Sequence, residues 1–112
     1  MKVSELAAAN NFEILNKGNN LATEITGGYT SDLLSDVMGN VEEGMVWITL
    51  QVHRNIVAVA ALKEVAAIIL IGGARLDEET LSQAEQQGVT VLTTDLPAFE
   101  TSGLIYSLLQ QK

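Results

Sequence analysis

Residues 66–77 read Ala-Ala-Ile-Ile-Leu-Ile-Gly-Gly-Ala-Arg-Leu-Asp, and this stretch decides the fold class. The first six residues are continuously apolar, which is typical of a central strand in a parallel sheet that is covered on both faces. A glycine pair then allows a sharp turn, and Asp77 is a good N-cap for the helix predicted from Glu78 to Gln87. An apolar strand, a small polar tip and a helix form the repeating unit of parallel α/β proteins.

The same unit recurs along the chain. The predicted strands are 12–15, 24–26, 45–50, 66–71 and 89–93. Four helices are predicted at 3–9, 56–64, 78–87 and 97–109. A further helix is capped by Thr30 or Ser31 and ends at Met38, before Gly39. The tips are Thr26-Gly27-Gly28-Tyr29, Gln51-Val52-His53-Arg54-Asn55, Gly72-Gly73-Ala74-Arg75 and Thr93-Thr94-Asp95. The fold class is therefore α/β with a parallel sheet, and we expect a ligand at these tips, outside the carboxyl ends of the strands.

Composition narrows the classes of protein that fit. The chain has 112 residues, which make one domain, 1–112, and a hydrophobic fraction of 47% is enough for one core. Six basic and fourteen acidic residues give a net charge of −8, which argues against nucleic acid or an anionic membrane as a partner. There is no cysteine, no signal-peptide pattern and no apolar run long enough to span a bilayer. We therefore expect a cytoplasmic protein without disulfides.

Eight residues in and beside the tips are candidates for ligand binding. Glycine pairs let the backbone approach a ligand closely, and each pair precedes a helix whose first N–H groups attract anions. Arg75 adds a bidentate clamp for phosphate or carboxylate, and it ranks above Arg54 because it follows a glycine pair. Histidine and asparagine add hydrogen bonds, and tyrosine adds a ring that stacks. The candidates are Gly27, Gly28, Tyr29, His53, Asn55, Gly72, Gly73 and Arg75.

Each candidate also has a purely structural interpretation. Tight strand-to-helix turns need glycine whether or not a ligand binds there. Arg75 is placed to pair with Asp77 or Glu78, and His53 to be an exposed residue that hydrogen-bonds the start of a helix. Tyr29 suits core packing as well as it suits stacking on a base. The sequence leaves these alternatives open.

Motifs for several enzyme chemistries are missing. There is no Gly-x-x-x-x-Gly-Lys-Ser/Thr loop, so we expect no kinase or ATPase activity. There is no Gly-x-Ser-x-Gly elbow, and one histidine without cysteine does not make a zinc site of the common types. Asp32 and Asp36 stand one helical turn apart and could bind Mg²⁺, but a solvated helix face explains them better. We expect neither a metal nor a cofactor.

Residues 56–62 read Ile-Val-Ala-Val-Ala-Ala-Leu, which makes this predicted helix apolar almost all round. A helix without a polar face is buried on two sides, and a second subunit is one way to cover the second side. In the competing arrangement the helix is buried within one subunit, between the sheet and the C-terminal helix. The first arrangement predicts a homo-oligomer, most simply a dimer.

Three longer stretches carry a family resemblance: 25–33, 69–79 and 84–92. The last two are similar to a run of apolar strand, Gly-Gly, acidic helix and a Gly-Ile/Val-Pro-Leu-Leu strand, with Thr90 where proline is common. This run resembles the DRTGG domain family, a module similar to the N-terminal domain of HPr kinase/phosphorylase, although the five-letter name motif is not spelled out. The resemblance implies a three-layer α/β/α fold with a central mixed sheet and a regulatory or ligand-sensing role. It supplies no catalytic residues.

Three functional hypotheses follow. The first is a non-enzymatic regulatory domain that binds a small anionic metabolite or nucleotide at the carboxyl edge of the sheet. The second is an interaction module that binds another protein through the helix at 56–62 and the C-terminal helix. The third is a small hydrolase or transferase that uses His53 as a base.

Overall fold

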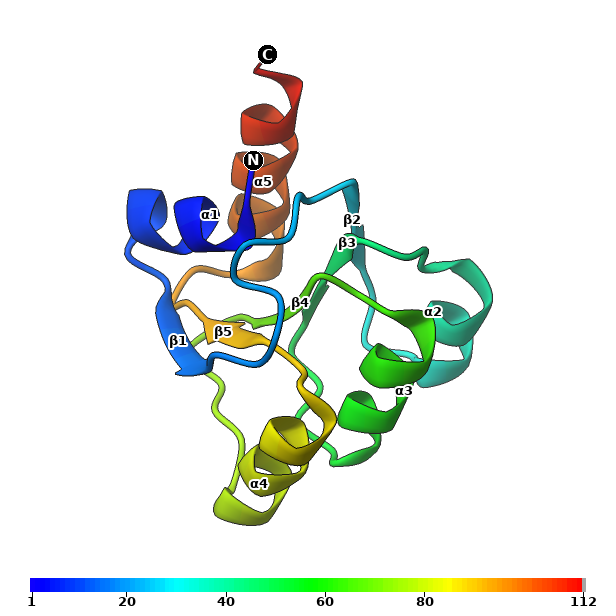
Figure 1. Cartoon of the computed structure of the whole chain (residues 1–112). Helices are drawn as coiled ribbons and strands as arrows, with labels where there is room; N and C mark the ends of the chain where they lie inside the picture. Colours follow the sequence, from blue (N-terminus) through cyan, green and yellow to red (C-terminus); the bar gives the residue numbers. More distant parts are fainter. Residues whose placement is uncertain (112) are drawn as a thin grey trace.

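The computed structural model describes residues 1–111, in which five strands and five helices follow one another (Figure 1). The strands are β1 (Glu13–Asn16), β2 (Gly27–Thr30), β3 (Met45–Thr49), β4 (Ala67–Leu70) and β5 (Val91–Thr93). The helices are α1 (Val3–Asn10), α2 (Leu34–Asn40), α3 (Asn55–Lys63), α4 (Glu78–Gln87) and α5 (Ala98–Gln110). None of the helices within this range has the length and apolar character that crossing a membrane requires.

The strands form one sheet in the order β1-β5-β4-β3-β2. Strands β2 to β5 run parallel to their neighbours, and β1 pairs with β5 in the antiparallel sense. All four residues of the central strand β4 are buried, as its continuous apolar sequence predicts. The predicted α/β class with a mixed, mostly parallel sheet is confirmed.

Helices cover both faces of this sheet (Figure 1). On one face α1 and α5 pack against the sheet through residues such as Leu6 and Ile105. On the other face α2, α3 and α4 enclose a second core around Trp47 and Ile56. The fold is therefore a three-layer α/β/α sandwich.

The region from 24 to 40 differs from its prediction. The strand lies at Gly27–Thr30 instead of 24–26, because these residues pair with β3 from Gly27 opposite Met45 to Thr30 opposite Ile48. Pairing with a buried neighbour outweighs the low strand propensity of two glycines. Helix α2 consequently begins at Leu34, and Gly39 lies inside it instead of closing it. The helix predicted from Glu78 to Gln87 is α4 with both ends as expected.

Helix α3 is less buried than its sequence suggests. Ile56, Val57 and Ala60 face the core, whereas Leu62 is 68% exposed. The helix packs beside α2 and α4, and not beneath the C-terminal helix α5, which lies on the other face of the sheet. Since most of its outward side chains are small, α3 leaves little apolar surface for a second subunit to cover.

Candidate functional site

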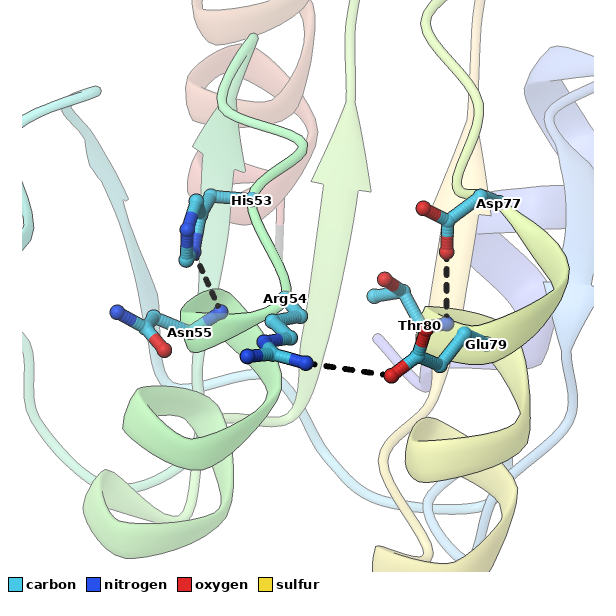
Figure 2. Close-up of polar contacts among 6 residues, drawn as sticks. All are labelled: His53, Arg54, Asn55, Asp77, Glu79 and Thr80. Carbon is cyan, nitrogen blue, oxygen red and sulfur yellow. Dashed lines mark hydrogen bonds and ion pairs between the residues drawn. The ribbon is translucent and has the colours of Figure 1, made fainter.

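The four parallel strands end at one edge of the sheet, and their loops meet there. These loops are 31–33 after β2, 50–54 after β3, 71–77 after β4 and 94–97 after β5. Helices α3 and α4 begin at the same edge, so their first N–H groups lie there as well (Figure 2). Five sequence candidates occupy these loops or the first turn of α3: His53, Asn55, Gly72, Gly73 and Arg75.

Gly27 and Gly28 do not form a tip, because β2 continues through them to Thr30. Neither has the positive φ that a tight turn would demand. A Cβ atom on Gly27 would lie 3.6 Å from the Met45 side chain, and one on Gly28 would lie 3.5 Å from Val46, which are ordinary contacts. The pair lies along the open edge of the sheet, away from the carboxyl-end loops.

Tyr29 hydrogen-bonds a residue of α2 and packs against the core. Its hydroxyl donates to both carboxylate oxygens of Asp36, at 2.9 and 2.8 Å, and its ring packs against the Trp47 core. Hydrogen bonds from Ser31 and then from Tyr29 hold the pKa of Asp36 below its usual value. The Asp36 carboxylate in turn raises the pKa of Tyr29. These contacts favour the core-packing interpretation of Tyr29.

Asp32 ties the ends of β2 and β3 together. One of its oxygens accepts hydrogen bonds from the Thr49 hydroxyl and from the Leu50 N–H, both at 2.7 Å. Because α2 begins after it, Asp32 does not share a helix face with Asp36. Within residues 1–111, no cluster of three or more His, Cys, Asp or Glu side chains could hold a metal ion.

His53 and Asn55 start helix α3. Nδ1 of His53 accepts a hydrogen bond from the Asn55 N–H at 3.1 Å, and the His53 carbonyl accepts one from Ile56 (Figure 2). In the neutral ring the proton is therefore on Nε2, and both side chains are exposed. Asn55 does not cap the helix with its side chain, because it is the first helical residue. The predicted role of His53 as a hydrogen-bonding partner of the helix start is confirmed.

Gly72 and Gly73 turn the chain toward the β5–α5 loop. Their φ angles are +61° and +75°, which other residues adopt only with strain. The Gly72 N–H donates to the Leu96 carbonyl at 2.8 Å, and the Gly73 N–H donates to the Thr94 carbonyl at 2.9 Å. The glycines are thus needed for the turn, and both N–H groups are used within the chain.

Arg75 is held by an acidic partner that lies far from it in the sequence. Its two terminal nitrogens bond both carboxylate oxygens of Glu13 on β1, at 2.8 and 2.6 Å. This pairing replaces the expected one with Asp77 or Glu78. The arginine holds the pKa of Glu13 below its usual range, and Glu13 raises the pKa of Arg75. Both side chains are about half exposed, and Glu13 already occupies two of the five N–H donors of the guanidinium, so an anion would compete with it for them.

Arg54 lies between the first turns of α3 and α4 (Figure 2). It reaches Glu79 through one contact of 3.2 Å, and both side chains are well exposed. Asp77 beside it caps α4 by accepting from the Thr80 N–H at 2.8 Å. Hydrogen bonds from Thr80 lower the pKa of Asp77, with a smaller effect from Arg54. Of the two arginines, Arg54 is the less firmly held.

Two exposed apolar side chains at this edge are not among the candidates predicted from the sequence. Leu50 directly follows the buried strand β3 and is 51% exposed, and Leu96 lies three residues after the end of β5 and is 38% exposed. Gly72 joins them, because a Cβ atom there would lie 3.6 Å from Leu50 and its N–H bonds the Leu96 carbonyl. The signal that could have found them is position, since an apolar residue just past a parallel strand leaves the cover of the helices.

The chain belongs to the DRTGG domain family, because the model of that family matches residues 5–108. No protein of curated function matches the sequence. One similar solved structure is titled as the CBS and DRTGG domains of the regulatory region of Clostridium perfringens pyrophosphatase, complexed with its activator, diadenosine tetraphosphate. The similarity has a TM-score of 0.71 at 19% identity and covers 93% of this chain. The chain spans 45% of the length of that structure's chain.

Proposed function

We propose that this chain is a non-enzymatic regulatory domain that binds a nucleotide or another small anionic metabolite at the carboxyl edge of the sheet. The observation that carries the proposal is the pairing of an apolar platform with a releasable arginine at that edge. The platform consists of Leu50, the adjacent Gly72 and Leu96, whose carbonyl accepts from the Gly72 N–H; the exposed side chains of the two leucines suit a base or another flat ring. Arg54 supplies the charge for a phosphate.

Displacing Glu79 from Arg54 costs little. An exposed ion pair contributes about 0–1 kcal/mol, so a phosphate with more charge and more acceptor oxygens can replace the carboxylate. The first N–H groups of α3 and α4 add partial positive charge at the same edge. The similar pyrophosphatase regulatory region was solved with a nucleotide activator, which supports the choice of ligand class.

The arrangement of the side chains argues against chemistry at this edge. His53 uses Nδ1 to start helix α3, and no acid holds its other nitrogen in the contacts found for residues 1–111. Hydrolase activity with His53 as base would need a partner that orients the ring. A regulatory role needs only binding, which the platform and Arg54 supply.

A thermal-shift titration with AMP, ATP, diadenosine tetraphosphate and inorganic phosphate tests the proposal. At a ligand concentration about 100 times Kd, binding adds about 2.7 kcal/mol to the unfolding free energy, or about 10 °C in Tm. Leu50→Ser and Arg54→Ala should each weaken the response to nucleotides. Lys63→Ala is the matched control, because Lys63 lies at the other end of α3.

The outcomes separate the alternatives. No rise in Tm with any nucleotide, or an unchanged response in Arg54→Ala, would contradict the site. Arg75→Ala belongs in the same experiment. The preceding glycine pair favours Arg75 as the anion-binding residue in the sequence, whereas the looser ion pair of Arg54 favours Arg54 in the structure. ATP hydrolysis that His53→Ala abolishes would restore the enzymatic hypothesis.

Protein interaction is the second candidate function. The observation that favours it is an open groove between α1, β2 and α5, on the face of the sheet opposite α3. The exposed side chains of Phe99 and Tyr106 line this groove.

A further inference from the structure

The groove between α1, β2 and α5 has a volume of about 1440 Å³. Gly27 and Gly28 lie along it on the edge strand, and Phe99, Gly103 and Tyr106 line it from α5. Phe99 is 86% exposed and Tyr106 is 69% exposed, which is far more than such rings show when a fold covers them. Exposed aromatic rings beside an apolar groove are typical of an interaction surface.

The glycines of this groove are not required by the fold itself. Gly103 lies in the middle of α5, where glycine is unfavourable, and a Cβ atom there would meet nothing within 4 Å. Gly27 would make only an ordinary contact with Met45. Neither glycine has a positive φ. The absence of side chains at these positions therefore makes room for atoms that come from outside the chain.

Charge identifies the partner that fits this face. The protein carries a net charge of −8, yet Glu100 is the one charged residue among the thirteen of α5. The acidic residues that line the groove, Glu5 and Glu24, already bond the Lys2 N–H and the N-terminal amine. A basic partner would prefer the acidic surfaces elsewhere. Charge is sparse on this face, because the N-terminal amine offsets Glu24 and α5 carries one charged residue, so a second acidic copy meets less repulsion here.

The spacing along α5 makes the face self-complementary. Phe99, Gly103 and Tyr106 are four and three residues apart, so they lie on one side of the helix. If two α5 helices cross in antiparallel directions at Gly103, Phe99 of each copy lies against Tyr106 of the other. The glycines at the crossing point let the helices come close, and the twofold axis makes both halves of the interface identical.

We infer that this face is a dimer interface, in which α5 of a second copy of the chain docks against α5 and the adjoining groove. The sequence alone predicts an interface on α3. This face instead lies on the opposite side of the sheet. The inference rests on the interaction role and not on the nucleotide site. A failed nucleotide titration therefore leaves it unaffected, and its own test uses no ligand.

Sedimentation equilibrium of the full chain from 1 to 200 µM is the test. We expect the parent, whose monomer mass is 12.0 kDa, to reach twice that mass within this range. Phe99→Glu/Tyr106→Glu should raise the dimer dissociation constant by at least about tenfold, because the rings dominate the contact. Gly103→Arg is a second variant that has open space within its own chain. Leu62→Glu is the matched control, since Leu62 is equally exposed on α3.

Dimers of the parent and of Leu62→Glu, together with a dimer dissociation constant at least about tenfold higher in both α5 variants, would support the inference. A parent that stays monomeric at 200 µM would overturn it, and the groove would then belong to a partner of different sequence. Dimers that persist with an unchanged dissociation constant in both α5 variants, or that only Leu62→Glu disrupts, would also overturn it. Far-ultraviolet circular dichroism of each variant shows whether it is folded.

Discussion

The carboxyl edge of the sheet and the groove between α1, β2 and α5 use glycine in opposite ways. Gly72 and Gly73 adopt positive φ angles and bond the β5–α5 loop, so the chain itself requires them. Gly27 and Gly103 have ordinary backbone angles and leave space that the chain does not fill. A glycine therefore indicates a binding surface most clearly where the fold does not need it.

The two regions also differ in how much apolar surface they leave exposed. At the carboxyl edge, Asp32, Arg75 and the N–H groups of the glycine pair all have partners within the chain. In the groove, polar side chains such as Thr30 and Ser102 also pair with each other, at 2.8 Å, but the rings of Phe99 and Tyr106 are left exposed. These contacts hold the first region in one shape, whereas the second leaves aromatic rings exposed.

The largest expected effect is at Asp32, which joins β2 to β3. Asp32→Ala removes the acceptor for the fully buried Thr49 hydroxyl and for the Leu50 N–H. We expect the unfolding free energy to fall by about 1.5–3 kcal/mol, measured by urea denaturation. Asp32→Asn is the control, because its amide oxygen can still accept. A loss below 0.5 kcal/mol in the alanine variant would show that this edge is less firmly held than the contacts indicate.

The glycine pair should give the next largest effect. Gly73→Ala places a methyl group 3.2 Å from the Asp95 carboxylate on a residue with a φ of +75°. We expect a loss of about 1–2 kcal/mol from the backbone strain, with a similar loss for Gly72→Ala. Gly27→Ala is the matched control in the groove and should change the unfolding free energy by less than about 0.5 kcal/mol. Equal losses in Gly73→Ala and Gly27→Ala would show that the fold requires both glycines alike.

Gly103→Ala should have the opposite sign. Alanine is about 1 kcal/mol more favourable than glycine inside a helix, and the methyl group meets nothing within the chain. In the Phe99→Glu/Tyr106→Glu background, where we expect the dimer to be weakened, urea denaturation should show this full gain. In the parent background the gain should be smaller, because the methyl group enters the interface. The same gain in unfolding free energy in both backgrounds would show that Gly103 lies outside the interface.

The smallest effect is the pH dependence at Glu13. Its pKa is lowered in the folded state by the Arg75 guanidinium, so at pH values below about 4.5 the unfolded chain binds the proton more readily than the folded chain. The stabilisation of the folded state by the Glu13–Arg75 ion pair is present above that pH and is lost as the pH falls through the pKa of Glu13 in the folded state. Glu13→Gln should flatten the decrease in stability between pH 5 and pH 3. An unchanged acid limb in thermal melts would show that the ion pair adds nothing.

Much of the fold follows from local patterns, but the pairing of distant residues does not. The continuous apolar run of β4 and the Asp77 cap of α4 specify their own elements, so both are predictable from sequence. The strand at Gly27–Thr30 is not, because β3 makes it a strand by pairing with it. Arg75 likewise finds Glu13 only after the antiparallel β1 joins β5, and no local signal indicates that pairing. The sequence identifies Phe99 and Tyr106 as aromatic residues of the C-terminal helix, but it does not predict that their side chains are exposed.

We propose separate roles for the two regions, the carboxyl edge for a nucleotide and the groove for a second copy of the chain. A pair of amide-resolved NMR titrations of the same sample distinguishes these roles. Adding ATP should shift amides in 50–55, 72–75 and 94–96, whereas diluting the protein should shift those in 27–30 and 99–106. Two separate sets of shifts are the predicted result. Shifts from ATP confined to the groove, or no shift in either titration, would contradict the account.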